Sequence, residues 1–266
     1  HSLISLERLG SATTCSENRT KLKRSGIKLA ADSVQVISKC CPNLAMLELC
    51  RQERGSEISA VDILCLSSLS NLHNLALEKL APTGGREMTE AFASLGSSDG
   101  VPFRAINFKS RRFEMSGFDL VPFFSGWRCS KLQSVDFFDF RMTDESILAL
   151  ARNSGESLEE VFLSKNSCSI APLLIPGCTS LKTLGLFFVM NEILVQIGKH
   201  YCCKSSQLRG ITIALDYSEK DCDSGVQGLV PMLSEVQEIA LQSTKCSVKV
   251  IAKVAIACKN FEFLRV

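Results

Sequence analysis

The chain contains 266 residues, of which 45% are hydrophobic and 22% are charged, so its composition excludes a disordered tail and predicts a globular protein with a sizeable core. Its 30 basic and 28 acidic residues leave a formal net charge of +2, which gives no support to a nucleic-acid or membrane partner. In addition, no apolar run approaches the roughly 18 to 20 residues that a membrane-spanning helix requires.

Two parts of unequal length are expected along the chain. Residues 1–30 are predicted to be an N-terminal segment or a partial repeat, and residues 31–266 a single repeat domain. The first ten residues, HSLISLERLG, include no initiator methionine and no signal-peptide core. We therefore expect the chain to be a fragment of a longer protein.

A regular apolar spacing, which we call the apolar frame, recurs from residue 44 to the end of the chain. Each unit has apolar residues at a first position, three residues later and five residues later, as in Leu44, Leu47 and Leu49. About nine units follow one another at intervals of 23 to 31 residues, with first positions at Leu44, Leu72, Phe103, Leu132, Leu158, Leu181, Leu208, Val236 and Phe261. This period is the length of one strand plus one helix, so the frame predicts an α/β solenoid. An ordinary α/β domain with evenly spaced strands is the alternative.

The segments between these units have the amphipathic pattern of helices. In MTDESILALARNSG, Thr143 is a candidate N-cap, and Asp144 and Glu145 place negative charge in the first helical turn, where the helix dipole favours it. Gly155 marks the end of this helix. The segments EISAVDILCLSSLS, NEILVQIGKHYC and SVKVIAKVAIAC show the same pattern. We expect helices on the outer, convex side of the solenoid and strands on its inner, concave side.

The segment between Leu77 and Phe103 differs from the others because it is long and rich in glycine. It contains Pro82, Gly84 and Gly85, and near its end the flexible sequence GSSDG. Such segments form loops over the rim of a solenoid, where binding residues are often found. A surface insertion without a function is the alternative.

The 13 cysteines favour buried thiols over metal ligands or disulfides. No two of them have the C-x-x-C spacing typical of zinc sites, and a chain of this size does not need a disulfide framework. Four of them, Cys41, Cys129, Cys178 and Cys258, lie three residues before the first position of a unit. A buried thiol suits this point, where a helix meets a strand. We expect neither a metal nor a cofactor.

The motif C-x-x-L-x-x-L-x-L, preceded by helices such as MTDESILALARNSG, resembles the cysteine-containing subclass of leucine-rich repeats. This resemblance implies a horseshoe-shaped solenoid with an inner parallel β-sheet and outer helices. The subclass is best known from F-box proteins, so the resemblance also implies a non-catalytic substrate receptor of a cullin-type ubiquitin ligase. Its partners would be a protein substrate on the concave face and, if an F-box lies upstream, the ligase adaptor subunit. Its location would be cytoplasmic or nuclear.

Residues that alternate with the apolar frame are expected on the concave face, because successive side chains of a strand point to opposite sides. Three phenylalanines, Phe138, Phe162 and Phe187, then fall on neighbouring strands and predict an exposed aromatic patch that binds a partner. Asp136 and Glu160 belong to the same face. Packing of the rings beneath irregular loops is the alternative.

A short basic run is expected beside this patch, at the edge where the strands end. It consists of Lys109, Arg111 and Arg112, and Arg141 follows one repeat later. Arginine at this edge suits a carboxylate or phosphate on a partner. A solvated loop is the alternative interpretation.

Three other functions are weighed against a ligase receptor. The first is an adaptor or regulatory scaffold unrelated to ubiquitin, and the second is an extracellular recognition receptor, which intact disulfides would favour. The third is an enzyme, for which His200 beside Cys202 and Cys203 is the one pair with nucleophilic potential. At a helix end of a repeat, however, this pair is better explained as structural.

Overall fold

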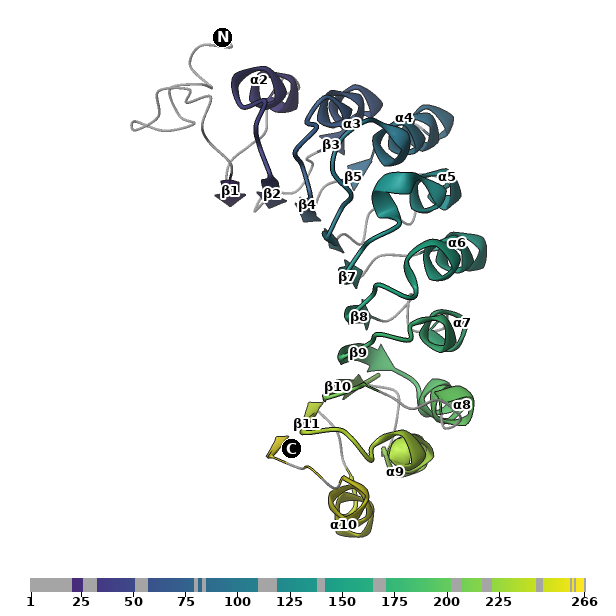
Figure 1. Ribbon diagram of the computed structural model, residues 1–266. Helices are drawn as coiled ribbons and strands as arrows, with labels where there is room; N and C mark the ends of the chain where they lie inside the picture. The colour runs from purple at the N-terminus through teal and green to yellow at the C-terminus, as the bar shows by residue number, and fades with distance from the viewer. Residues whose placement is uncertain are drawn as a thin grey trace.

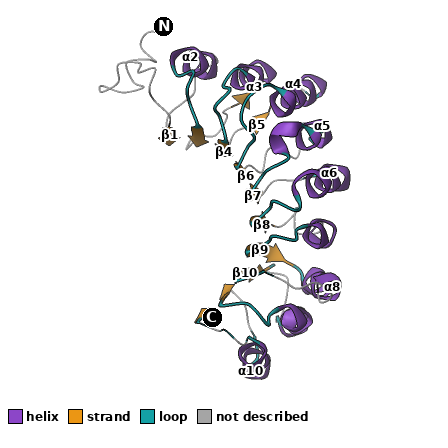
Figure 2. Ribbon diagram, viewed as in Figure 1, coloured by secondary structure: helices purple, strands orange, loops and turns teal. Residues whose placement is uncertain are grey.

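The computed structural model is an arc of repeating strand and helix units (Figure 1). It describes residues 21–25, 33–50, 57–78, 81–82, 85–109, 119–137, 142–164, 171–201, 207–216, 222–242, 246–258, 260 and 262–265. Strands form the inner side of the arc and helices form its outer side, with β1 and β12 at opposite ends of the arc (Figures 1 and 2). The predicted α/β architecture, with an inner parallel sheet and outer helices in a solenoid-like arrangement, is confirmed.

The described strands of the arc form one ten-stranded parallel sheet in chain order, β1-β2-β4-β6-β7-β8-β9-β10-β11-β12. Their bounds are β1 Lys21–Ser25, β2 Met46–Cys50, β4 Asn74–Glu78, β6 Ala105–Lys109, β7 Ser134–Phe137, β8 Glu160–Ser164, β9 Thr183–Val189, β10 Gly210–Leu215, β11 Glu238–Gln242 and β12 Phe263–Arg265. A separate pair of short strands, β3 (Glu57–Ile58) and β5 (Ala81–Pro82), lies outside this sheet. The apolar frame did not identify β1, whose sequence is KLKRS.

Helices alternate with the strands and cover one face of the sheet (Figure 2). Their bounds are α2 Ser33–Cys40, α3 Ala60–Ser67, α4 Arg86–Ser97, α5 Val121–Ser125, α6 Asp144–Ser154, α7 Ala171–Leu174, α8 Asn191–Tyr201, α9 Asp223–Leu229 and α10 Val248–Ala257. Short 3-10 turns follow α5, α7 and α9, at Trp127–Cys129, Ile175–Gly177 and Val230–Met232. The longest helix of the described residues has 12 residues, and none is long and apolar enough to cross a lipid bilayer.

The start of α6 shows how the sequence determines a helix boundary. The Oγ1 atom of Thr143 accepts a hydrogen bond from the N–H of Ser146 at 3.1 Å, and Gly155 follows the helix as its C-cap. The N-cap satisfies a donor that would have no partner within the helix. Both predicted boundaries of this helix are confirmed.

The segment that follows Leu77 was expected to be a rim loop, and this expectation is wrong for most of its length. Residues Arg86–Ser97 form α4, and its buried residues include Met88, Ala91, Phe92 and Leu95. These four have the i, i+3, i+4, i+7 spacing of a helix that packs on a core. Because glycine and proline occur only before and after them, the segment contains an ordinary helix of the repeat.

Backbone hydrogen bonds at the start of each strand set the register of the sheet. The N–H groups of His73 and Asn74 both donate to the carbonyl oxygen of Ala45, at 3.0 and 3.1 Å. The same arrangement recurs in the next repeats, for example where Glu159 and Glu160 donate to Gln133. As a result, the apolar positions of adjacent units lie side by side, and in the first eight units every one of them is at most 2% exposed.

A buried arginine connects three repeats in the middle of the arc. Arg128 is fully buried and donates hydrogen bonds to the carbonyl oxygens of Leu72 and Val101 and to the hydroxyl of Ser98. Its guanidinium group also lies 4.3 Å from the ring centroid of Phe103, a cation–π distance. Burial lowers the pKa of this group from its ordinary value because the charged form loses hydration.

Candidate interaction surface

The inner face of the sheet is formed by residues that alternate with the buried apolar frame. The register places Asp136 beside Phe162, Phe162 beside Gly185, and Gly185 beside Thr212. Two residues further along the strands, Ser164 lies beside Phe187 and Phe187 beside Ala214. Phe162 and Phe187 therefore lie on neighbouring strands, as predicted.

Phe162 on β8 and Phe187 on β9 come together over a glycine. A methyl group added at Gly185 would lie 3.1 Å from Cε2 of Phe187 and closer still to Cδ1 of Phe162, so both rings rest on this position. Each phenylalanine is half-buried. Glycine in a strand often marks such a close approach, because it has no side chain to keep other atoms away. We call Phe162 and Phe187 the aromatic pair and Gly185 its glycine floor.

On β10 and β11, next to the aromatic pair, the inner face carries small side chains and projects less than the rings do. Gly210, Thr212 and Ala214 of β10 follow Thr183, Gly185 and Phe187 in register, and Ala240 of β11 follows Thr212. Among the described residues, no atom lies closer than 3.9 Å to a methyl group built on Gly210, so the surface is open at this position. A partner side chain placed here would contact the edge of the aromatic pair.

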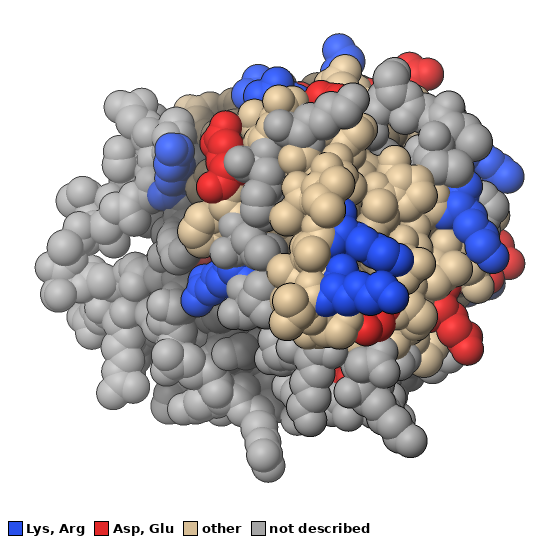
Figure 3. Space-filling view, turned by 90° about the horizontal axis from the view of Figure 1, so that it is seen from below, with Lys and Arg blue, Asp and Glu red and all other residues tan. Residues whose placement is uncertain are grey.

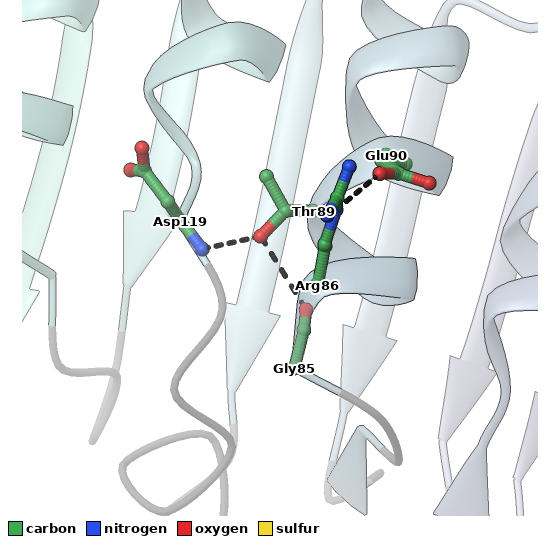
Figure 4. Close-up of polar contacts among 5 residues, drawn as sticks. All are labelled: Gly85, Arg86, Thr89, Glu90 and Asp119. Atoms are coloured by element: carbon green, nitrogen blue, oxygen red, sulfur yellow. Dashed lines mark hydrogen bonds and ion pairs between the residues drawn. The ribbon is translucent and has the colours of Figure 1, made fainter.

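The third predicted ring, Phe138, lies outside the described residues. The same is true of Arg111, Arg112 and Arg141, so most of the predicted basic run has no described position. The segment that contains Arg111 and Arg112 leads to Asp119, whose N–H donates to Oγ1 of Thr89 at 2.7 Å (Figure 4). This contact places Asp119 beside the start of α4.

Lys109 and Asp136, which were both expected to bind a partner, contact each other. The Nζ atom of Lys109 lies 2.8 Å from Oδ2 of Asp136, and the two side chains are 34% and 23% exposed. The pair links β6 to β7 and partly neutralises both charges. A partner that binds either residue must therefore compete with an existing ion pair.

Two neighbours of this ion pair offer hydrogen-bond acceptors on the inner face. Asn107 lies beside Asp136 in register, and its Oδ1 atom is buried with no hydrogen-bond donor among the described residues. Glu160 begins β8 and is exposed. Glu160 was predicted from the sequence, whereas Asn107 was not, because a single asparagine in a strand gives no signal of an open acceptor.

The four cysteines before the apolar frame are buried, as expected: Cys41, Cys129, Cys178 and Cys258 are at most 8% exposed. Burial raises the pKa of Cys178 to about 12 and also raises the pKa values of Cys129 and Cys258, because the thiolate form loses hydration. These thiols are chemically inert near neutral pH. His200, Cys202 and Cys203, the residues of the enzyme alternative, have no described side chains.

Cys222 and Cys246 differ from these cysteines because they form a disulfide. The expectation of reduced cysteines is wrong for this pair. Among the described residues, Cys222, Asp223 and Cys246 are also a close group of potential metal ligands, but the two sulfur atoms are bonded to each other. The signal in the sequence is their separation of 24 residues, close to one repeat period, which places both cysteines near the start of consecutive helices.

Two grooves of the described surface lie on the helix side of the arc. One, of about 600 Å³, lies between α3 and α4 and is lined by Ser59, Ala60, Val61, Leu64, Glu87, Glu90 and Ala91. Another, of about 480 Å³, lies between α5 and α6 and includes Glu145, Leu148 and Arg152. Both are shallow surface grooves, and neither adjoins the aromatic pair.

Comparison with known proteins does not place this chain in a family. No protein-family model matches it, and no curated protein matches its sequence. The sequence pattern and the surface described above therefore carry the functional argument.

Proposed function

We propose that this chain is a protein-recognition module built from leucine-rich repeats, and that its partner binds the inner face of β8, β9 and β10. One observation carries this proposal: the rings of Phe162 and Phe187 meet over Gly185 on the side of the sheet that the helices do not cover. The parallel sheet, the outer helices and the buried apolar frame support the repeat class.

The chemistry of this face suits a protein partner better than a reaction. Half-buried aromatic rings provide a large apolar contact area at low entropic cost, and residues of this kind are frequent centres of binding energy. The adjoining positions on β10 are small, which leaves space for the side chains of the partner. The exposed carboxylate of Glu160 provides a hydrogen-bond acceptor at the edge of the same surface.

We further propose that the repeats select a substrate for an F-box-type cullin ubiquitin ligase. The support is the cysteine-containing form of the repeat, in which Cys41, Cys129, Cys178 and Cys258 are buried where a helix leads into a strand. In this role the chain is a non-catalytic subunit of the ligase. Its partners are a protein substrate and, through an upstream F-box, the ligase adaptor, in the cytoplasm or the nucleus.

A second candidate is an extracellular recognition receptor, and one observation favours it. The disulfide between Cys222 and Cys246 is of the kind that persists in oxidising compartments. Both candidates use the inner face to bind a protein. They differ in the redox state of this pair and in whether a ligase adaptor is bound.

The binding face is tested by capture of partners with three forms of the complete gene product. We expect Phe162→Ala combined with Phe187→Ala to weaken a specific partner by roughly thirtyfold or more, as loss of about 2 kcal/mol at a binding centre predicts. Val61→Ala combined with Leu64→Ala is the matched control, because these exposed apolar residues lie on the helix side at α3. The control is expected to retain the partner.

Gly185→Ala sharpens this test because it keeps both rings and displaces them. The added methyl group would collide with the rings of Phe162 and Phe187, so we expect weaker binding of the same partner. Equal capture by all forms would exclude the inner face as the binding site. Absence of the ligase adaptor from every capture of the complete gene product would exclude the ubiquitin role and leave the recognition role.

A further inference from the structure

Two cysteines lie near the starts of the last two described helices. Cys222 is the N-cap residue of α9, and Cys246 immediately precedes Ser247, the N-cap residue of α10. Their Cα atoms are 5.1 Å apart, within the range of about 4.4 to 6.8 Å that disulfides span. The stacking of consecutive repeats thus brings the two sulfur atoms together.

Hydrogen bonds hold the two segments side by side independently of the disulfide. The N–H of Ser247 donates to Oδ1 of Asp223 at 2.8 Å, and the hydroxyl of Ser247 accepts from the N–H of Val250 at 3.3 Å. The hydrogen bonds from Ser247 lower the pKa of Asp223, so its carboxylate stays charged and accepting near neutral pH. The cysteines therefore remain neighbours when the disulfide is reduced, and this proximity favours its re-formation.

The two sulfur atoms differ in their access to solvent. Cys222 is fully buried, whereas Cys246 is partly exposed. Thiol–disulfide exchange requires direct approach of a thiolate to a sulfur atom, so an attacking thiol reaches Cys246 first. The buried Cys222 then acts as the leaving group in reduction and as the internal nucleophile in oxidation.

We propose that Cys222 and Cys246 form a reversible thiol–disulfide exchange site for small thiols and disulfides of the glutathione class, with Cys246 as the entry point. In reduction, a glutathione thiolate attacks Sγ of Cys246, the bond to Cys222 breaks, and the Cys222 thiolate takes a proton from water. A second glutathione thiolate attacks the glutathione sulfur of this mixed disulfide. Glutathione disulfide then leaves, and Cys246 is released and protonated.

Oxidation follows the same steps in reverse. The Cys246 thiolate attacks glutathione disulfide and forms a mixed disulfide, which releases one glutathione thiolate. The Cys222 thiolate then attacks Sγ of Cys246 and releases the second glutathione. The two electrons that the cysteines lose reduce glutathione disulfide to two thiols, so the step needs no other oxidant.

The location of this site gives the exchange a structural effect. The disulfide ties α10 to α9 beside the last strands of the described sheet. The last described repeat exposes Val248, Ile256 and Phe263, and Lys and Arg side chains lie among uncharged ones on the face seen in Figure 3. Reduction therefore removes the covalent link between α9 and α10, and we expect its effect on this pair of helices. This proposal does not rest on the binding role of the aromatic pair.

The test is a redox titration of the complete chain in glutathione buffers, with thiols trapped by alkylation and assigned by peptide mass spectrometry. We expect Cys222 and Cys246 to change together between disulfide and dithiol as the proportion of glutathione disulfide rises. Cys178 is the internal control and is expected to remain a thiol throughout. Amide hydrogen exchange in α10 should be faster by a factor on the order of a hundred in the reduced form, as the lost loop constraint predicts.

Two single variants test the order of the steps. In Cys222→Ser, Cys246 has no internal partner and is expected to accumulate as the glutathione mixed disulfide. In Cys246→Ser, the buried Cys222 is expected to remain unmodified. The titration of the unaltered chain does not depend on whether either variant folds.

Four results would overturn the proposal. The first is a pair that stays reduced in glutathione disulfide. The second is a pair that resists reduction by millimolar glutathione, as a permanent extracellular disulfide does. Alternatively, the reduced pair holds zinc added at equimolar concentration, or Cys222 is modified before Cys246.

Discussion

The middle and the end of the arc are stabilised in different ways. Around β6 and β7 the core is aromatic, with Phe92 and Phe123 in an edge-to-face contact at 5.3 Å, and Arg128 connects backbone atoms of three repeats. Around β11 and β12 the core is aliphatic, and a covalent bond joins neighbouring repeats. Buried side-chain contacts thus connect the repeats in the middle of the arc, whereas the disulfide adds a covalent link between α9 and α10.

The largest effect is expected from removal of the arginine in the middle of the arc. Arg128→Met keeps much of the volume but leaves the carbonyl oxygens of Leu72 and Val101 without their donor. We expect the free energy of unfolding to fall by about 3 to 5 kcal/mol, measured by urea denaturation. Arg152→Met, at an exposed position on α6, is the control. Equal stability of the two variants would contradict the proposed role of Arg128.

At the end of the arc, the disulfide is expected to have a local effect. In oxidising buffer, Cys222→Ser combined with Cys246→Ser should destabilise α10 by about 3 kcal/mol, because the link no longer restricts the unfolded chain. Hydrogen exchange resolved along the chain measures this change. Protection in α6 is expected to stay the same. An equal loss of protection in α6 and α10 would show that the middle of the arc and the region of α10 do not unfold independently.

A smaller effect is expected where α8 and α9 pack closely. A methyl group at Gly198 would collide with the carbonyl group of Gly228, whereas one at Gly210 would meet no atom closer than 3.9 Å. Gly198→Ala should therefore lower the free energy of unfolding by about 1 to 3 kcal/mol, and Gly210→Ala should change it little. Thermal denaturation of both variants tests this prediction, which is wrong if Gly210→Ala is the less stable variant.

The smallest effect is expected from the ion pair on the inner face. Lys109→Met should cost less than about 1 kcal/mol, because the pair with Asp136 is partly exposed and solvent screens it. The difference from the unaltered protein should shrink further at high salt. A large loss of stability that does not depend on salt would show that this pair supports the sheet and is not available to a partner.

Most of the sheet was predictable because one simple rule repeats along the chain. Apolar residues at fixed spacing identified β2, β4 and the strands that follow, and alternation placed Phe162 and Phe187 on the same face. β1 was missed because Arg24 occupies a position that is apolar in other units, as its pairing with Leu49 shows. The helix α4 was missed because flanking glycines obscured the spacing of Met88, Ala91, Phe92 and Leu95.

The features that were not predicted depend on contacts between repeats. Arginine is normally a surface residue, and Arg128 is buried only because turns of other repeats direct their carbonyl oxygens toward it. Similarly, Cys222 and Cys246 form a pair only when two repeats are stacked. The role of Gly185 as the floor of the aromatic pair could be found only from the positions of both rings.

The central claim is that a protein partner binds on the inner face beside the aromatic pair. The most direct measurement is photo-crosslinking in cells, with a photoreactive amino acid at Thr212 on the inner face or at Leu148 on the helix side. The account predicts a discrete protein adduct at position 212 that disappears when Phe162→Ala and Phe187→Ala are added, and no such adduct at position 148. An adduct at 148 alone, or one at 212 that persists without the two rings, would contradict it.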